Sequence, residues 1–379
     1  MNTCDMIIIG CGLTGAVIAQ EAATKEKKVL VVERRTHIGG NMYDYVEEHG
    51  FLVQKYGPHA FHTTNKSLYE YICRFEHWQE YHLKCGATWD GRYTPTPFNF
   101  KTIDVFFDTG KAQTIKAALQ KEYTDRAFVT VVEALEHNNK EIRNYAEYLF
   151  AQDYAPYTAK QWGISPDKID PSVLKRVPLR LDYGEGYFED EFQVLPQHSY
   201  TYFFQKLLDH PNIQVELGIN ALEKLEIGED TLFWEGEAFS GTVVYTGALD
   251  ELFNYKFGRL PYRSLRFEWE YRPEAKVQEA PIVAYPQESD YTRITEYKQL
   301  PPQEGEGTIL AKEFPLSCQE CNVEPYYPVL TEESQKCYAS YRNLAASIPN
   351  LICCGRLGDF KYYNMDQALA RALEIAQQL

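Results

Sequence analysis

Three glycines near the start of the chain have the spacing of a phosphate-binding turn. Gly10, Gly12 and Gly15 follow an apolar stretch and open an alanine-rich one, which is the context of a strand, a turn and a helix. In such a unit the first glycine makes the tight turn, the second lets the backbone approach a pyrophosphate, and the third lets helix and strand pack closely. The diphosphate then lies against unpaired N–H groups at the helix N-terminus. Glu33 ends the next apolar stretch and is placed to bind ribose hydroxyls, so the pattern predicts a dinucleotide site.

A second glycine pair favours FAD over NAD as this dinucleotide. Gly39 and Gly40, followed by Asn41, come shortly after Glu33. They would give a longer cofactor another close approach to the backbone. This E-x5-G-G spacing resembles the large flavoprotein family that includes amine oxidases.

Two later segments resemble the same flavoprotein family. Thr246 and Gly247 end a predicted strand in VVYTGALD, and Arg356 lies in CCGRLGDFKYYNMD, where a strand leads to a helix. The positive end of that helix would stabilise an anionic reduced flavin. The remaining expected cofactor contacts are Leu13, Thr14, Arg34, His59, His62, Tyr363, Asn364 and Met365.

The elements that must position these residues are strands and helices in alternation at both ends of the chain. The amino-terminal segment predicts a βαβ unit, with strands at 6–9 and 28–32 and a helix that ends at about residue 25. Near the other end, residues 350–354 predict a short apolar strand and residues 365–378 an amphipathic helix. We therefore predict an α/β fold with a discontinuous Rossmann-like FAD-binding domain.

The middle of the chain predicts two inserted parts. Residues 68–81 have an aromatic-rich helical pattern, and residues 84–93 suggest a hairpin with Asp90-Gly91 at its turn. Residues 102–159 carry apolar side chains at helical spacing, whereas residues 259–316 alternate like antiparallel strands. The expected domains are an FAD-binding domain (1–75, 205–250 and 335–379), a helical domain with a mobile loop (102–175) and an antiparallel β-sheet substrate domain (76–101, 176–204 and 251–334).

Composition and charge exclude several classes of protein. The 379 residues are 44% hydrophobic, which fits folded domains with sizeable cores. The net charge of −16 argues against a nucleic-acid partner or an anionic membrane surface. No stretch approaches the roughly 20 apolar residues that span a bilayer, and nine unevenly spaced cysteines suit reduced thiols, so we expect a cytoplasmic protein. The lone C-x-x-C of Cys318 and Cys321 lacks a second ligand pair, and we expect no metal site.

Six further motifs together resemble those of bacterial UDP-galactopyranose mutases. They occur in that family's order and at closely matching intervals along the whole chain. The motifs are YGPHAFHT (56–63), YTAKQWG (157–163), LKRVPLR (174–180), YTRITEYK (291–298), EPYYPV (324–329) and GRLGDFKYYNMD (355–366). The resemblance implies an isomerase that interconverts UDP-galactopyranose and UDP-galactofuranose.

The resemblance also implies a reaction without net redox change. N5 of reduced FAD would attack the anomeric carbon of galactose and expel UDP, and the flavin–sugar iminium would let the ring open and reclose before UDP returns. The flavin must be reduced, because only then is N5 nucleophilic, and NADPH or NADH is the expected reductant. A homodimer and a role in cell surface polysaccharide biosynthesis are further expectations from the family.

The family's chemistry assigns roles to particular residues. Charge develops on the diphosphate as UDP leaves, and Arg176 and Arg293 match the family's two diphosphate arginines. His59 and His62 match its pair beside flavin and sugar, where an imidazole tunes N5 protonation or donates a hydrogen bond. We expect these four residues to be catalytic. The other expected substrate contacts are Tyr154 as the uracil platform, Tyr157, Trp162 on a mobile loop, Tyr187, Tyr327, Tyr362 and Asn364.

Two positions depart from the family's pattern. Many members have a basic residue and a glycine where this chain has Ala155-Pro156, and proline stiffens the backbone where uracil should bind. Many also have an aspartate at the position of Asn364, whose amide carries no charge. We therefore do not expect Asn364 to act as a general base.

Three alternatives remain open from the residues. An FAD-dependent oxidoreductase of the amine oxidase-like family would share the fold and cofactor, but the paired arginines argue against it. A non-catalytic nucleotide-binding or regulatory subunit would be isolated without flavin. The third alternative is a bifunctional mutase that also accepts UDP-N-acetylgalactosamine, although His59, in place of a larger base, favours UDP-galactose.

Overall fold

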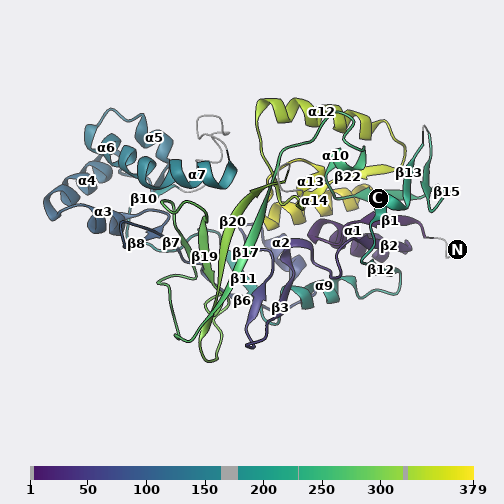
Figure 1. The fold of residues 1–379 in the computed structure, drawn as a ribbon, viewed down its shortest axis with the longest axis horizontal. Coiled ribbons are helices and arrows are strands. Elements are labelled where there is room, and N and C mark those ends of the chain that lie inside the picture. The colour runs from purple at the N-terminus through teal and green to yellow at the C-terminus, as the bar shows by residue number, and fades with distance from the viewer. Residues whose placement is uncertain (1–3, 164–177, 229, 319–322) are drawn as a thin grey trace.

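The computed structural model describes residues 4–163, 178–228, 230–318 and 323–379. Three groups of elements lie in a row (Figure 1). A domain with a parallel sheet forms one end, a long mixed sheet lies in the middle, and a group of helices forms the other end. The predicted combination of a Rossmann-like domain, a helical insertion and a sheet domain is confirmed.

The parallel sheet is built from segments far apart in the sequence. Its strand order is β12-β2-β1-β16-β22, and every neighbouring pair is parallel. The strands are β1 (Met6–Ile9), β2 (Val29–Glu33), β12 (Ile213–Leu217), β16 (Thr242–Tyr245) and β22 (Leu351–Cys353). Helix α1 (Leu13–Thr24) connects β1 to β2, as the glycine pattern predicts.

Alternating side chains of β1 anchor helices on both faces of this sheet. Met6 and Ile8 join the core that includes α1, α9 (Tyr200–Leu208) and α14 (Met365–Gln378). Ile7 and Ile9 point the other way, into a second core with α10 (Leu249–Leu252) and α12 (Glu332–Ala346). A strand buried on both faces needs this continuous apolar sequence.

The mixed sheet has the order β21-β17-β20-β19-β18-β7-β8. Its strands are β7 (Cys85–Trp89), β8 (Arg92–Thr96), β17 (Tyr262–Arg272), β18 (Ile282–Ala284), β19 (Arg293–Glu296), β20 (Thr308–Ser317) and β21 (Tyr327–Pro328). The predicted hairpin is confirmed, because Asp90 and Gly91 both have positive φ between β7 and β8. The purely antiparallel prediction is wrong at one place, since β18 pairs with β7 in parallel. The two strands come from separate segments, so no tight turn dictates their direction.

The helical group follows the predicted segment closely. It contains α3 (Phe100–Phe106), α4 (Thr109–Glu122), α5 (Val131–Leu135), α6 (Lys140–Leu149) and α7 (Ala155–Trp162). A π-helical turn, η2 (Phe150–Tyr154), joins α6 to α7. The short strands β9 (Phe128–Val129) and β10 (Leu179–Arg180) pair beside these helices. Within the described residues, none of the helices has the length and apolar character needed to cross a bilayer.

The helical prediction for residues 68–81 is half wrong. Helix α2 (Lys66–Ile72) is present, but β6 (Trp78–Glu80) is a strand. It pairs with β11 (Phe192–Pro196), which also pairs with β5 (Phe61–Thr63). This long-range pairing overrides the local helical spacing. The remaining short elements are η1 (Gly40–Met42), β3 (Asp44–Val46), β4 (Leu52–Gln54), η4 (Ala221–Glu223), β13 (Leu225–Ile227), β14 (Leu232–Trp234), β15 (Glu237–Phe239) and α13 (Gly355–Gly358).

Candidate active site

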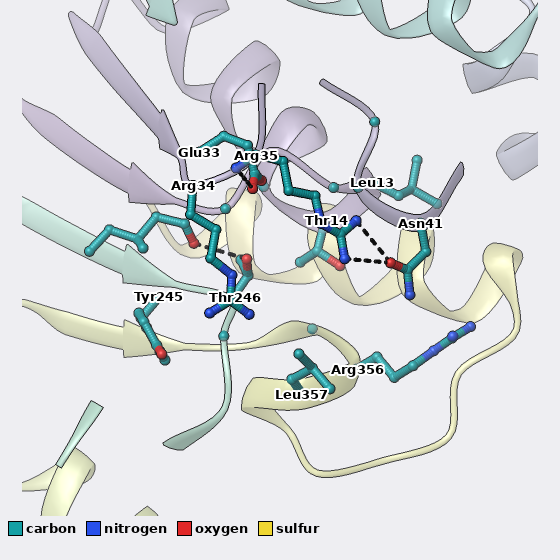
Figure 2. A pocket seen from close by; sticks show the side chains of 18 of the residues that line it. Leu13, Thr14, Glu33, Arg34, Arg35, Asn41, Tyr245, Thr246, Arg356 and Leu357 are labelled. Carbon is teal, nitrogen blue, oxygen red and sulfur yellow. Dashed lines mark hydrogen bonds between the residues drawn. The ribbon is translucent and has the colours of Figure 1, made fainter. Parts of the chain in front are cut away.

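The glycine turn after β1 forms the wall of a first cavity (Figure 2). Gly10 has φ +103°, and a Cβ atom added there would lie 2.1 Å from Oγ1 of Thr246. Thr246 cannot retreat freely, because its N–H and Oγ1 both donate to the Ile9 carbonyl, at 3.0 and 2.9 Å. A Cβ added to Gly15 would lie 2.0 Å from the Gly10 carbonyl oxygen. Both positions therefore require glycine, as the dinucleotide motif predicts.

The start of α1 suits an anionic group. Gly12 caps the helix without a side chain, and a Cβ added to it would meet only Gly40 Cα at 3.9 Å. The backbone of this turn is therefore open to the cavity, and first-turn N–H groups can meet a pyrophosphate. The first cavity extends from the glycine turn past Glu33 to Gly40 and Arg356. These features fit a bound dinucleotide such as FAD.

Glu33 is held in place by backbone hydrogen bonds. Its Oε2 accepts the N–H of Cys11 at 2.8 Å, and its Oε1 accepts the N–H of Arg35 at 2.9 Å. Each carboxylate oxygen keeps a further lone pair for a ribose hydroxyl. The side chain lines the first cavity, where the sequence predicts its ribose contact.

Two arginines after β2 also line this cavity, and only Arg34 was expected there. Arg34 pairs with Glu251 at 3.0 Å. Arg35 gives two hydrogen bonds of 3.0 Å to Oδ1 of Asn41 (Figure 2). It also gives two to Oε2 of Glu324, from Nε at 2.8 Å and from Nη2 at 2.5 Å. Arg35 therefore orients Asn41, a predicted cofactor contact. The sequence does not reveal this role, because Glu324, which also holds the Arg35 guanidinium, is far away along the chain.

A second cavity adjoins the first and has an empty volume of about 1770 Å³. The residues that line both cavities mark the junction. They are Asn41, His59, Tyr326, Arg356, Asn364 and Met365. The structure brings most predicted substrate residues to the wall of the second cavity. These are Tyr154, Tyr157, Tyr187, Arg293, Tyr327, Tyr362 and Asn364, and His62, predicted as a catalytic and cofactor residue, lines the same wall.

Two predicted substrate residues, Arg176 and Trp162, have side chains outside the described residues. Arg176 lies outside the described residues. Trp162 ends α7, but its side chain likewise lies outside the described part of the structure. Among the described residues, Arg293 and Arg356 are the only lysine or arginine side chains that line the second cavity.

Arg293 is fixed by a buried acidic partner that the motifs do not reveal. It lies opposite Glu313 on the neighbouring strand, with Nε 2.8 Å and Nη2 2.7 Å from Oε2 of Glu313. Glu313 is 1% exposed, and its Oε1 accepts a hydrogen bond from Thr292 at 3.0 Å. Burial opposes the positive charge, but the Glu313 carboxylate holds the pKa of Arg293 well above its usual value. Arg293 thus presents a permanent cation to the cavity.

His59 is a neutral imidazole at the junction of the two cavities. Burial, together with the positive charges of Arg356 and Arg293, lowers its pKa to about 4. Its Nδ1 lies 2.8 Å from the Gly57 carbonyl oxygen, so the proton belongs on Nδ1 and Nε2 is an acceptor. The sequence predicts either proton tuning or hydrogen-bond donation here, and the geometry leaves Nε2 as an acceptor.

His62 is oriented by two neighbours on the wall of the second cavity. Its Nδ1 lies 2.9 Å from Oδ2 of Asp190, and its ring stacks on Phe188 with centroids 3.6 Å apart. It does not belong to the residues that line the first cavity. The stacking and the carboxylate fix the ring plane, so its Nε2 direction is set by the fold.

The tyrosines that line the second cavity differ in what their rings and hydroxyl groups contact. Tyr154 is only 5% exposed and packs edge-on against Phe98 in the core of the helical group. The hydroxyl of Tyr327 accepts a hydrogen bond from Nε2 of Gln161, a residue not expected in the site. Asp153, before Tyr154, is a second unexpected lining residue. In the described ranges, no group of three His, Cys, Asp or Glu side chains is arranged to hold a metal ion.

Comparisons with known proteins agree with this geometry. Residues 152–362 match the family described as UDP-galactopyranose mutase, and residues 8–75 match the NAD(P)-binding Rossmann-like domain. UDP-galactopyranose mutase of Mycoplasma pneumoniae is 35% identical over 386 residues, covering 100% of this chain and 96% of the relative. dTDP-fucopyranose mutase of Escherichia coli is 35% identical over 379 residues, covering 98% and 97%. The crystal structure of a reduced UDP-galactopyranose mutase matches with a TM-score of 0.72 at 17% identity, covering 99% of this chain and 95% of that one.

Proposed function

Because the chain belongs to the UDP-galactopyranose mutase family, a family of flavin-dependent isomerases, we propose that it interconverts UDP-galactopyranose and UDP-galactofuranose with FAD as its cofactor. The observation that carries the proposal is the junction of the two cavities. A dinucleotide cavity opens, at His59 and Arg356, directly into a second cavity with a fixed arginine. This arrangement suits a reaction in which a cofactor meets the sugar of a phosphorylated substrate.

The chain's own residues would serve leaving-group binding and orientation. Arg293, held by Glu313, would bind the diphosphate and stabilise the charge that develops on it. The wall of Tyr157, Tyr327 and Tyr362 would hold the substrate and limit water around the reacting sugar. When bound, reduced FAD would supply the N5 nucleophile for the anomeric carbon.

His59 would act as a hydrogen-bond acceptor rather than as a cation. Its lowered pKa, about 4, keeps the imidazole neutral at the pH of a cell interior. An acceptor at the cavity junction can hold a proton of the cofactor or of a sugar hydroxyl. This assignment refines the two roles that the sequence leaves open for this residue.

The direct test uses dithionite-reduced protein and UDP-galactofuranose under anaerobic conditions, with chromatography of the products. We expect UDP-galactopyranose to appear and the flavin to remain reduced, and oxidised protein is the control. Substrate loss in step with consumption of an electron acceptor would support the oxidoreductase alternative instead. Preparations reduced with NADPH and with NADH would identify the native reductant in the same assay.

A second candidate substrate pair deserves the same assay because of one relative. dTDP-fucopyranose mutase of Escherichia coli matches this chain as well as UDP-galactopyranose mutase of Mycoplasma pneumoniae does, at 35% identity. The two reactions would share the cofactor and the diphosphate and differ in the nucleoside and at C6 of the sugar. A larger kcat/KM for dTDP-fucofuranose than for UDP-galactofuranose would move the assignment to that substrate. UDP-N-acetylgalactosamine is the third substrate to include.

A further inference from the structure

Asp153 places a carboxyl group in the second cavity without a hydrogen-bond partner among the described residues. It lies in the π-helical turn η2, immediately before α7, and lines the cavity beside Tyr154 and Thr158. No described side chain or backbone group donates a hydrogen bond to its carboxylate. π-Turns interrupt the regular helical hydrogen bonds and often occur at functional sites. Asp153 is only partly buried, so solvent in the cavity can reach its carboxylate. A ligand that displaces this solvent must supply a donor, because an unsatisfied acceptor under a bound ligand is costly.

The neighbouring cation does not fill this role. Nζ of Lys160 donates to the backbone carbonyl oxygens of Tyr285 at 2.8 Å, Pro286 at 3.3 Å and Glu288 at 2.6 Å. Burial raises the pKa of Asp153 to about 7, and the charge of Lys160 opposes this shift only in part. When a ligand fills this part of the cavity, the donor for Asp153 must therefore come from the ligand.

The order of charged groups along the cavity indicates which part of a ligand reaches Asp153. His59 and Arg356 lie at the junction with the first cavity, and Arg293 belongs to β19 of the mixed sheet. Asp153 and Tyr157 come from η2 and α7 of the helical group, which lies on the far side of the mixed sheet from the parallel-sheet domain (Figure 1). The order is therefore the cofactor junction, then Arg293, then Tyr157 and Asp153. A diphosphate at Arg293 with its sugar at the junction leaves the nucleoside for the Asp153 end.

We propose that Asp153 accepts a hydrogen bond from N3–H of the pyrimidine imide and thereby selects uracil or thymine over cytosine. The inference rests on the proposed function, because it assumes a nucleoside diphosphate sugar in this cavity. Uracil and thymine both carry the imide N3–H, whereas N3 of cytosine is an acceptor that faces another acceptor when Asp153 is ionised. Such a mismatch discriminates strongly, because it leaves buried polar groups unpaired. Because the pKa of Asp153 is about 7, the discrimination should be strongest above neutral pH.

The test measures binding of UDP, UDP methylated at N3, dTDP and CDP to the flavin-loaded protein by calorimetry, at a pH well above 7 where Asp153 is ionised. Methylation at N3 should weaken binding to the wild type about tenfold to hundredfold, the range of a hydrogen bond to a charged group. Asp153→Ala should weaken UDP and dTDP by a similar factor and should remove the penalty for methylation. Gln152→Ala is the matched control, because Gln152 lies in the same turn but bonds to Gln287, and neither residue lines the cavity. It should bind all four nucleotides like the wild type.

The conservative variant Asp153→Asn adds a gain of function. An asparagine can donate its amide N–H to N3 of cytosine and accept from the exocyclic amine, so the preference for UDP over CDP should shrink. This variant keeps the shape of the turn, so it also guards against misfolding of Asp153→Ala.

Three results would overturn the inference, and they have different meanings. Equal affinity of the wild type for UDP and for N3-methylated UDP would show that the imide is not recognised. A loss in Asp153→Ala that affects UDP but spares dTDP would assign the carboxylate to the ribose 2′-hydroxyl. Failure of the wild type to bind any of the pyrimidine nucleotides would sink the proposed function together with this inference.

Discussion

Replacing Arg293 with alanine should damage the protein in two separable ways. The first is structural, because Glu313 is 1% exposed and would keep only the Thr292 hydroxyl as a described side-chain partner. Removing one member of a buried ion pair typically costs about 3–5 kcal/mol of unfolding free energy. The second concerns the ligand, because the guanidinium would no longer contact the diphosphate. A charge-assisted hydrogen bond of about 1.5–3 kcal/mol corresponds to roughly 10- to 150-fold weaker UDP binding.

The double variant Arg293→Ala/Glu313→Gln separates these two effects. It removes the orphaned charge along with the arginine, so most of the lost stability should return. UDP affinity and turnover should not return, because no cation faces the diphosphate. Urea unfolding measures stability, and calorimetry with UDP measures binding, in both variants and in Glu313→Gln alone. All three proteins should keep the flavin spectrum, since Arg293 does not line the first cavity.

Two outcomes would refute the reasoning. Recovery of UDP affinity in the double variant would mean that Arg293 serves only to neutralise Glu313. Wild-type stability of Arg293→Ala would mean that the buried pair does not stabilise the sheet at β19 and β20.

The remaining predictions concern the cofactor cavity. Gly10→Ala should lower the melting temperature and yield colourless protein, because the new Cβ would meet Thr246 Oγ1 at 2.1 Å. Gly12→Ala should fold normally, because its Cβ meets only Gly40 Cα at 3.9 Å. It should still lose flavin, because the added methyl group occupies the place where the pyrophosphate approaches the backbone. Absorbance at the flavin bands and thermal melts of the apoproteins distinguish the two, and a stable yellow Gly10→Ala variant would contradict the steric argument. His59 has a pKa of about 4 when folded against about 6.5 when unfolded, so the unfolded state binds more protons between these values and stability falls as pH falls. From pH 7.5 to 4.5 this linkage should lower the free energy of unfolding of the wild type by about 2–3 kcal/mol. Urea titrations at both pH values should show that His59→Asn lacks this part of the loss.

The sequence predicts the parts of the fold that depend on local rules. The turn at Gly10 has one workable backbone conformation, and its flanking strand and helix follow from apolar periodicity. The hairpin turn at Asp90-Gly91 is equally local. The strand β6 is missed because its pairing with β11 joins segments more than a hundred residues apart. Local aromatic spacing carries no record of such a partner.

The candidate site likewise combines residues that the sequence predicts with residues that it misses. Motif resemblance brings Arg293 to attention, but not Glu313, the partner that keeps it charged and oriented. A signal was nevertheless present, because Glu313 continues a strand whose first four residues, 308–311, are all buried, and it has the same side-chain direction as Ile309 and Ala311. A charged residue at an inward-facing strand position requires a partner of opposite charge. Asp153 gave no such signal, since nothing in the sequence around Tyr154 predicts a π-turn.

The charges along the second cavity also constrain the direction in which a nucleotide sugar can bind. The chain carries a net charge of −16, so a diphosphate is attracted only where arginines gather locally. Arg293 and Arg356 provide that attraction toward the cofactor, and the proposed base contact, Asp153, belongs to η2 beside the helical group (Figure 1). A reversed nucleotide sugar would move its diphosphate away from both arginines and place it beside Asp153, which offers no cation to the phosphate oxygens. Binding with the diphosphate at Arg293 is therefore favoured, and this orientation carries the sugar toward the cofactor.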